Sequence, residues 1–265
     1  MKLALCQMDI SWLNFKENLD RIKKYTNAAE AAKADVVIFP EMALSGFCMD
    51  EVAASLKLDS PEIKELLLMT RSLKVMVMVG AAIKIGTDHY NSFLIIRNGE
   101  ILTSYSKINL FKISNEHEHY KPGNNLLLID YMGVTIAPFV CFDTRFPALW
   151  SLGTKQGAEL FIVIASWPAA QQQQWRTLLS ARAIDTQAYV IGVNRIGVGD
   201  GIEYSGDSNV FTPGGKALLP FNAEERLSYI EIDGSYVKKI RERFPVLSEQ
   251  HGKQPDTSCT RLSIK

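Results

Sequence analysis

The sequence has no long hydrophobic run and no excess of charge of either sign. No window reaches the roughly 18 consecutive apolar residues of a membrane-spanning helix, and the apolar run before Asp9 is too short for a signal-peptide core. Lys plus Arg and Asp plus Glu both total 29, so the formal net charge is +0 and no long-range field attracts polyanions. We expect a cytoplasmic protein with neither nucleic acid nor a membrane as a partner.

Cysteine is also scarce, and no two cysteines have CxxC spacing. The four are Cys6, Cys48, Cys141 and Cys259. A chain of 265 residues buries enough surface to be stable without disulfides, so scattered cysteines indicate reduced thiols. One of them is therefore available for chemistry.

Motifs for nucleotide and zinc binding are missing. The sequence contains no GxGxxG after a strand, no GxxxxGK[ST] and no HExxH, so it offers no motif for a phosphate cradle or a metalloprotease centre. The segment Glu116–His119 (EHEH) is the one cluster that resembles metal ligands. Its four neighbours alternate faces in a strand and fan out in a helix, so we expect no metal site.

Along the sequence, short apolar runs alternate with longer amphipathic stretches. This pattern is typical of an α/β protein with helices outside layered sheets. The predicted strands are Lys2–Met8, Val36–Phe39, Val75–Val79, Tyr90–Arg97, Glu100–Tyr105, Leu126–Asp130, Gly133–Val140, Leu160–Ala165, Tyr189–Asn194, Asn209–Thr212, Lys216–Leu219 and Leu227–Ile232. The predicted helices are Asn14–Lys33, Ser60–Ser72, Ala148–Gln156 and Gln172–Gln187. No linker separates the halves, so we expect one domain over residues 1–265.

Three local signals refine this prediction. Asn98-Gly99 predicts a tight hairpin turn, which places Lys107 just past the end of a strand. Pro138 favours an edge position or a bulge for its strand. From Phe244 onward the tail lacks periodicity, and we expect it to reach a second subunit or to fray.

Polar residues that directly follow buried strands are candidates for a site, because ligands collect at the carboxyl ends of strands. Glu41, Lys107, Cys141 and Ser166-Trp167 occupy such positions. Partial desolvation would raise the proton affinity of Glu41 toward that of a general base. The alternative is a solvated loop glutamate.

Cys141 ends an apolar run and precedes a predicted helix. Backbone N–H groups and the helix dipole at such a turn favour the thiolate, although an inert buried thiol is an equal alternative. Cys6 lies inside a strand and Cys259 in a polar tail, whereas Cys48 stays a candidate.

Lys107 is a lone cation among apolar and neutral residues. If it is buried, it needs an anionic partner such as Glu41 or a developing oxyanion; otherwise it is an exposed lysine. A Cys141 dyad with His117 or His119 is a further arrangement, but no local motif supports it.

Three segments taken together resemble one enzyme family. They are Phe39-Pro40-Glu41, Tyr105-Ser106-Lys107 and Val140–Pro147 (VCFDTRFP). Their order and spacing resemble the Glu-Lys-Cys triad of the nitrilase, or carbon–nitrogen hydrolase, superfamily. Ser45-Gly46-Phe47 and Ser166-Trp167-Pro168 look most like the bacterial omega-amidases of that superfamily.

The resemblance implies a four-layer αββα sandwich that forms homodimers or higher homo-oligomers. It implies Glu41, Lys107 and Cys141 as catalytic residues. Glu116 best matches the family's second glutamate beside the triad, with Glu118 as the alternative.

The resemblance also implies a reaction without metal or organic cofactor. An omega-amidase cleaves the terminal amide of a small 2-oxo dicarboxylate monoamide, such as 2-oxoglutaramate, to carboxylate and ammonia through a thioester. Lys107 and the Phe142 backbone N–H would stabilise the oxyanion, while Trp167, Arg145 and Arg195 are candidates for binding substrate. The alternatives are an amidase acting on deaminated glutathione or an N-carbamoyl amine, a true nitrilase, and a binding protein without turnover, against which the intact triad argues.

Overall fold

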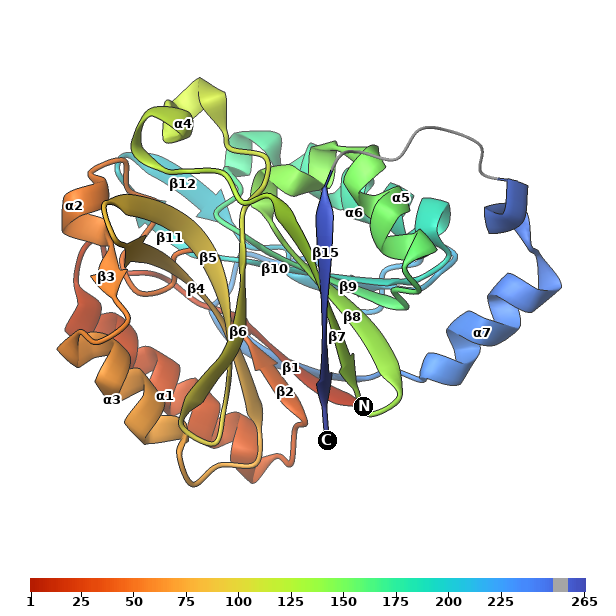
Figure 1. Cartoon of the computed structure of the whole chain (residues 1–265), viewed down its shortest axis with the longest axis horizontal. Helices are drawn as coiled ribbons and strands as arrows, with labels where there is room; N and C mark the ends of the chain where they lie inside the picture. The colour runs from red at the N-terminus through yellow and green to blue at the C-terminus, as the bar shows by residue number, and fades with distance from the viewer. Residues whose placement is uncertain (250–256) are drawn as a thin grey trace.

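Two β-sheets pack against each other in the computed structural model, which describes residues 1–249 and 257–265 (Figure 1). The first sheet has the order β14 (Arg226–Glu231), β1 (Lys2–Gln7), β2 (Val36–Ile38), β4 (Met76–Ile85), β5 (Asp88–Arg97), β6 (Glu100–Ser106), with β3 (Leu56–Lys57) beside β4. The second sheet has the order β13 (Asn209–Phe211), β10 (Tyr189–Asn194), β9 (Leu160–Ala165), β8 (Val134–Val140), β7 (Asn125–Tyr131), β15 (Ser258–Ile264). A separate ribbon pairs β11 (Ile196–Gly199) with β12 (Ile202–Ser205).

Helices cover the outer face of each sheet (Figure 1). α1 (Phe15–Ala31) and α3 (Pro61–Thr70) pack on the first sheet, and α5 (Pro147–Lys155) and α6 (Gln172–Thr186) on the second. The remaining helices are α2 (Glu51–Ala54), α4 (Glu116–His119) and α7 (Gly234–Arg243), with 3-10 turns at Lys112–Ser114, Cys141–Arg145, Ala169–Gln171 and Val246–Glu249. The four layers are those of the expected αββα sandwich.

The strands of the first sheet are apolar on both faces because each face is covered. In β1, Leu3 and Leu5 belong to the core between the two sheets, whereas Ala4 and Cys6 belong to the core beneath α1 and α3. Successive side chains of a strand point to opposite faces. Continuous apolar runs in the sequence therefore serve two layers at once.

Polar side chains cap two of the helices, and the predicted hairpin turn is confirmed. Asn14 accepts a hydrogen bond from the Glu17 backbone at the start of α1, and Ser60 caps α3, whose first residue is Pro61. Asn98 and Gly99 have φ angles of 54° and 79° and join β5 to β6, as a type I′ turn requires.

The edge position predicted for Pro138 is wrong. Its strand β8 lies between β7 and β9. The antiparallel ladder with β7 ends at Ile136, whereas Pro138 pairs with Ile162 of β9. The proline is tolerated inside the sheet because it lies beyond the ladder with β7, where its missing N–H removes no partner.

The chain after β13 also differs from the prediction. The strand expected at Lys216–Leu219 is reduced to a single bridge between Phe211 and Ala217. The tail after Phe244 does not simply fray, because β15 runs parallel to β7 from Ser258 to Ile264. β15 is an edge strand whose side chains are mostly exposed, which is why hydrophobic periodicity missed it. No helix in the described part of the chain is both long and apolar enough to cross a membrane.

Candidate active site

Glu41 follows β2 and is completely buried. Its loop lies directly on β4, where a Cβ added to Gly80 would approach Pro40 O to 2.4 Å and Glu41 Cα to 2.6 Å. The Gly80 N–H donates to Pro40 O, and the Ala43 N–H donates to Gly80 O. Glycine is therefore required at position 80 for this loop to hold Glu41 in place.

Lys107 leaves the end of β6 and is also completely buried. Its ammonium donates to Glu41 Oε1 at 2.9 Å, to Glu116 Oε1 at 3.1 Å and to Glu116 Oε2 at 2.9 Å. Burial opposes its charge, but the carboxylates of Glu116 and Glu41 outweigh that effect and raise the pKa of Lys107 above its ordinary value. All three ammonium hydrogens are engaged in the resting enzyme.

The one-turn helix α4 turns Glu116 inward and leaves Glu118 exposed. Glu116 Oε2 accepts from the Phe111 N–H at 2.6 Å and from Lys107, and Oε1 accepts from Asn91 Nδ2 at 2.9 Å and from Lys107. Four donors fill the four acceptor positions of a carboxylate. Glu116 therefore has none left for a water or substrate in this state.

Glu41 differs from Glu116 because three hydrogen bonds reach its carboxylate, which leaves one acceptor position open. Oε1 accepts from Lys107 and from Asn91 Nδ2 at 2.7 Å, while Oε2 accepts only from the Ser166 N–H at 2.7 Å. The Cys141 thiol lies close enough to this carboxylate for the Glu41 charge to raise its pKa. A proton arriving from the thiol can thus be held by Glu41 without loss of an existing hydrogen bond.

Cys141 begins the 3-10 turn after β8 and has a left-handed φ of 44°. Its side chain is partly accessible. Burial is the main cause that raises the pKa of the Cys141 thiol well above its ordinary value, the Glu41 charge raises it further, and the Lys107 charge lowers it. This direction is opposite to the stabilisation of the thiolate expected from the turn, so formation of the thiolate requires a base that accepts the thiol proton.

A narrow cavity of about 50 Å³ gives access to Cys141. Its walls include Phe142, Arg145 and Trp167, three of the predicted site residues. The Arg145 guanidinium lies 4.8 Å from the centre of the Trp167 ring and donates to the side-chain oxygens of two neutral glutamines, Gln171 and Gln174. Within residues 1–249 and 257–265, no carboxylate forms an ion pair with Arg145, so it presents an unpaired positive charge at the cavity.

The substrate-binding role predicted for Arg195 is not supported. Arg195 is completely buried and is not part of the cavity wall. Its Nη2 donates to Asp9 Oδ1 and Ile10 O, both at 3.0 Å, and its guanidinium stacks on Tyr204 at 4.6 Å. Arg195 is a packing residue that fixes the loop after β1 to the ribbon of β11 and β12.

The other candidates lie apart from Cys141. Cys48 is buried in a small apolar cluster and its thiol faces the Asp50 carbonyl at 3.8 Å. His117 is exposed, and His119 pairs with Glu51 at 2.7 Å. Among the described residues, no group of three or more His, Cys, Asp and Glu side chains is arranged to hold a metal ion.

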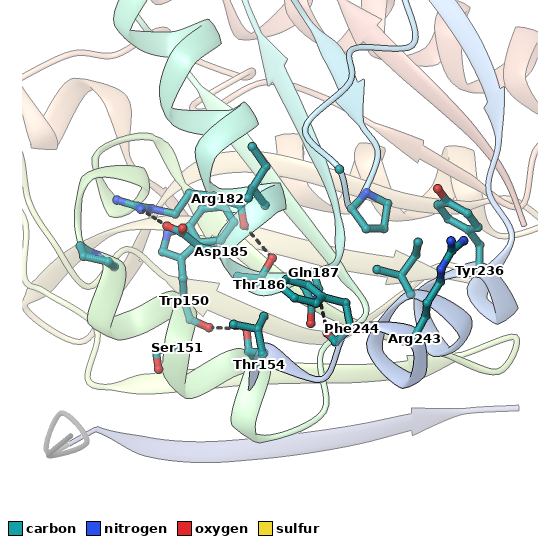
Figure 2. Close-up of a pocket in the computed structure, with 16 residues that line it drawn as sticks. Trp150, Ser151, Thr154, Arg182, Asp185, Thr186, Gln187, Tyr236, Arg243 and Phe244 are labelled. Atoms are coloured by element: carbon teal, nitrogen blue, oxygen red, sulfur yellow. Dashed lines mark hydrogen bonds and ion pairs between the residues drawn. The ribbon is translucent and has the colours of Figure 1, made fainter. Parts of the chain in front are cut away.

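A second, wider space lies between α5, α6 and α7 (Figure 2). This groove of about 860 Å³ has mainly apolar walls, in which Arg182 and Asp185 form an ion pair at 3.0 Å. None of the four cysteines lines it. Because the narrow cavity contains Cys141 beside the buried Glu41, we assign the chemistry to that cavity.

Asn91 is the residue of this site that the sequence did not reveal. Its side-chain NH₂ donates to both Glu41 and Glu116, and its backbone carbonyl accepts from the Lys107 backbone N–H at 2.9 Å. The available signal was a carboxamide in the middle of a buried strand, because a buried amide needs partners.

Comparisons with known proteins agree on one family. A model of the carbon–nitrogen hydrolase family matches residues 2–242. The omega-amidase YafV of Escherichia coli (strain K12) is 33% identical over 247 residues, which cover 92% of this chain and 94% of the relative. The 2-oxoglutaramate amidase of Bacillus subtilis (strain 168) is 28% identical over 250 residues, which cover 93% of this chain and 96% of the relative.

A solved structure agrees in fold as well. A CN-hydrolase superfamily protein from Xanthomonas campestris, with an arsenic adduct in its active site, superimposes with a TM-score of 0.88 and 27% identity. The match covers 96% of this chain and 98% of that protein.

Proposed function

The chain belongs to the carbon–nitrogen hydrolase family and is an amide-cleaving cysteine hydrolase, and we propose that it removes ammonia from a small 2-oxo dicarboxylate monoamide. The observation that carries this proposal is the convergence of Glu41, Lys107 and Cys141 at one narrow cavity that also presents Arg145. The similarity to an omega-amidase and to a 2-oxoglutaramate amidase supports the substrate class.

The first half-reaction forms a thioester. The Cys141 thiol gives its proton to Glu41, and the thiolate attacks the amide carbon. The tetrahedral oxyanion is stabilised by Lys107 and the Phe142 backbone N–H. Glu41 then passes its proton to the amide nitrogen, the carbon–nitrogen bond breaks, and ammonia leaves.

The second half-reaction regenerates the thiol. Glu41 takes a proton from a water molecule, whose oxygen attacks the thioester carbon. The tetrahedral intermediate collapses to the carboxylic acid and the Cys141 thiolate, which recovers its proton from Glu41. The acid then gives its own proton to the released ammonia, and the products are carboxylate and ammonium. No group outside the chain, the substrate and water is needed for atoms and protons to balance.

The shared lysine couples proton transfer to oxyanion binding. All three hydrogens of the Lys107 ammonium point at carboxylates in the resting enzyme. When Glu41 accepts the thiol proton it becomes neutral, and its hold on Lys107 weakens because a charge-assisted hydrogen bond becomes an ordinary one. One N–H of Lys107 is then released at the moment the oxyanion forms, while Glu116 keeps the ammonium in place.

Arg145 is proposed to bind the substrate carboxylate. It is the unpaired cation of the cavity, and a bidentate carboxylate partner would replace the hydrogen bonds to neutral glutamines. Trp167 forms one wall and holds the guanidinium by stacking. A small cavity with one cation suits a short acidic amide better than a peptide-sized one.

The test is ammonia release from 2-oxoglutaramate and 2-oxosuccinamate beside propionamide, an N-carbamoyl amine and a nitrile. The proposal expects fast turnover of the 2-oxo acid amides that is lost in Cys141→Ala. Arg145→Gln should raise KM for these substrates about 10-fold or more, the value of one charged hydrogen bond, and leave propionamide unaffected. Turnover of the N-carbamoyl amine or the nitrile in preference to the 2-oxo amides would reject the substrate class.

We further propose that one hydrolase domain spans residues 1–265 and assembles as a homodimer in the cytoplasm. Four cysteines that are all free support a reducing compartment. The exposed apolar side chains of Ile184 and Phe244, 52% and 64% accessible, lie at the groove of Figure 2 and support a subunit contact there. Light scattering should give two or more copies for the natural chain and a single copy for Ile184→Lys; one copy for both would remove this proposal.

A further inference from the structure

Asp143 is a buried carboxylate that the proposed reaction does not use. It lies two residues after Cys141 and is completely buried. Oδ2 accepts from the Tyr105 hydroxyl at 2.8 Å and from the Val140 N–H at 3.1 Å. Oδ1 accepts from the Asn109 N–H at 2.9 Å and from Asn109 Nδ2 at 2.8 Å. Every acceptor position of the carboxylate is filled.

The charge of Asp143 is compensated by these donors alone. No ion pair involves Asp143 within the described ranges. Burial raises the pKa of Asp143, and the hydrogen bonds from Asn109, Tyr105 and Val140 oppose that rise. A carboxylate that only accepts is the one form that satisfies all four donors, because a neutral amide in its place would present an NH₂ group to some of them.

The donors come from the two chain segments that supply the lysine and the nucleophile. Tyr105 precedes Lys107 by two residues, and Asn109 follows it by two. Val140 directly precedes Cys141, and Asp143 itself belongs to the nucleophile turn. The carboxylate therefore connects the residues on both sides of Lys107 with those on both sides of Cys141. Lys107 follows a strand of the first sheet and Cys141 a strand of the second.

The turn that Asp143 holds requires support. Cys141 has a positive φ of 44°, a conformation that is unfavourable for a residue with a side chain and persists only when its surroundings impose it. The Asp143 carbonyl accepts from Trp150 Nε1 of α5 at 3.1 Å, so the turn is fixed from the helical layer as well. The side chain and backbone of one residue thus anchor the turn on two sides.

We propose that Asp143 is a positioning residue that sets the placement of the Cys141 sulfur relative to the Lys107 ammonium. This inference rests on the proposed roles of Cys141 and Lys107 and holds for whichever amide the enzyme cleaves. Asp143 acts on the transition state, in which the Cys141 sulfur, the carbonyl carbon of the substrate and the Lys107 ammonium must be aligned. It has little influence on the binding of the intact amide. A misplacement of about 1 Å costs about 10²-fold in turnover.

The experiment is a double-mutant cycle on the full chain, measured with the amide that the natural enzyme cleaves fastest. Asp143→Asn keeps the shape of the side chain but replaces one acceptor oxygen with an NH₂ group, which then faces other hydrogen-bond donors. We expect kcat to fall about 10²-fold with KM changed less than about 3-fold. In a Lys107→Met background the same change should cost less than about 5-fold, because the lysine that it positions is already gone.

Two further variants keep the test informative if Asp143→Asn is poorly folded. Tyr105→Phe removes one donor of the four and should lower kcat by a smaller factor, again with an unchanged KM and again with a weaker effect beside Lys107→Met. Glu159→Gln is the matched control: Glu159 is a buried carboxylate just before β9, at the opposite end of that strand from Ser166. It should change thermal stability without changing kcat.

The outcomes separate this inference from the proposed function. Full additivity of Asp143→Asn or Tyr105→Phe with Lys107→Met would overturn the positioning role, as would a rise in KM with unchanged kcat. Failure of the proposed substrate would show in the natural enzyme, as turnover of another amide, before any variant is made. Failure of the Cys141 role would show as activity that survives Cys141→Ala.

Discussion

The narrow cavity at Cys141 and the wide groove beside α7 differ in the chemistry of their walls more than in their space. The groove encloses about 860 Å³ and the cavity about 50 Å³. The groove has exposed apolar side chains and one ion pair, Arg182 with Asp185. The cavity ends at the Cys141 thiol, which lies beside the buried Glu41, and Glu41 shares Lys107 with a second glutamate, Glu116. Convergent ionisable groups, and not volume, identify the reactive site.

Removal of the nucleophile is the change with the largest expected effect. Cys141→Ser should reduce ammonia release to the background rate, because a hydroxyl at this position is far harder to deprotonate than a thiol. Ammonia release with a coupled assay measures this loss. Cys48→Ser is the control at another buried cysteine and should keep at least half of the activity; the opposite ranking would assign the nucleophile to Cys48.

Removal of the shared cation comes next. Lys107→Met keeps the length of the side chain but removes the oxyanion donor, and kcat should fall about 10²–10³-fold, as for other acyl-transfer sites. The two glutamates would then face each other without a cation, so a loss of thermal stability should accompany the loss of rate. Steady-state kinetics and thermal unfolding on the same sample check both effects. A variant with natural kcat would show that Lys107 only neutralises its neighbours.

A methyl group at position 80 tests how tightly the cavity wall is built. Gly80→Ala places a Cβ within 2.6 Å of the Glu41 backbone, so the loop must move. We expect kcat to fall about 10²-fold through displacement of the base. Gly214→Ala is the control, because a Cβ added there would meet its nearest neighbour, Thr212 Oγ1, only at 3.9 Å. Natural activity in Gly80→Ala would mean that the position of Glu41 is less critical than the geometry implies.

The proton affinity of the Cys141 thiol offers a sharper comparison, because Glu41 and Lys107 should shift it in opposite directions. Burial, and then the Glu41 charge, raise the pKa of Cys141, while the Lys107 charge lowers it. Glu41→Gln should therefore shift the thiolate titration to lower pH, and Lys107→Met should shift it to higher pH. Ultraviolet thiolate absorbance, corrected with Cys141→Ala, measures both shifts. Shifts of the same sign in both variants would contradict the proposed electrostatics, and a thiolate at neutral pH in the natural enzyme would remove the need for a base.

The smallest effect is expected in the groove. Ile184→Ser changes a half-exposed side chain of its wall and should leave kcat/KM within about 2-fold, because Ile184 lines the groove and not the cavity at Cys141. Arg145→Gln is its counterpart in the narrow cavity. An equal loss in both variants would break the distinction between the two spaces.

Local patterns in the sequence were sufficient for the layered α/β class and for placing Glu41, Lys107 and Cys141 near strand ends, whereas the four-layer sandwich and the roles of these residues came from the resemblance to the carbon–nitrogen hydrolases. β9 and β10 have the predicted bounds, and the hairpin turn at Asn98-Gly99 was identified from two residues. These elements are set by short-range rules: continuous apolar runs and residues that tolerate positive φ. β15 and the ribbon of β11 and β12 were missed because their side chains are largely exposed and show little hydrophobic pattern.

The parts of the site that depend on tertiary contacts could not be read from the sequence. The choice between Glu116 and Glu118 is made by Asn115, whose left-handed conformation starts α4 and turns Glu116 toward Lys107. No feature of the neighbouring sequence shows that Arg145 faces a cavity whereas Arg195 packs on Tyr204. The sign of the Cys141 pKa shift depends on how deeply the turn is buried, which only the packed sheets decide.

Trapping of the acyl-enzyme tests the central claim most directly. The natural enzyme is mixed with 2-oxoglutaramate, quenched in acid and examined by mass spectrometry after proteolysis. The mechanism predicts a mass increase equal to the acyl group on the peptide that contains Cys141, labile to hydroxylamine and absent from Cys141→Ala. An adduct on any other peptide, or steady ammonia release by Cys141→Ala, would contradict it.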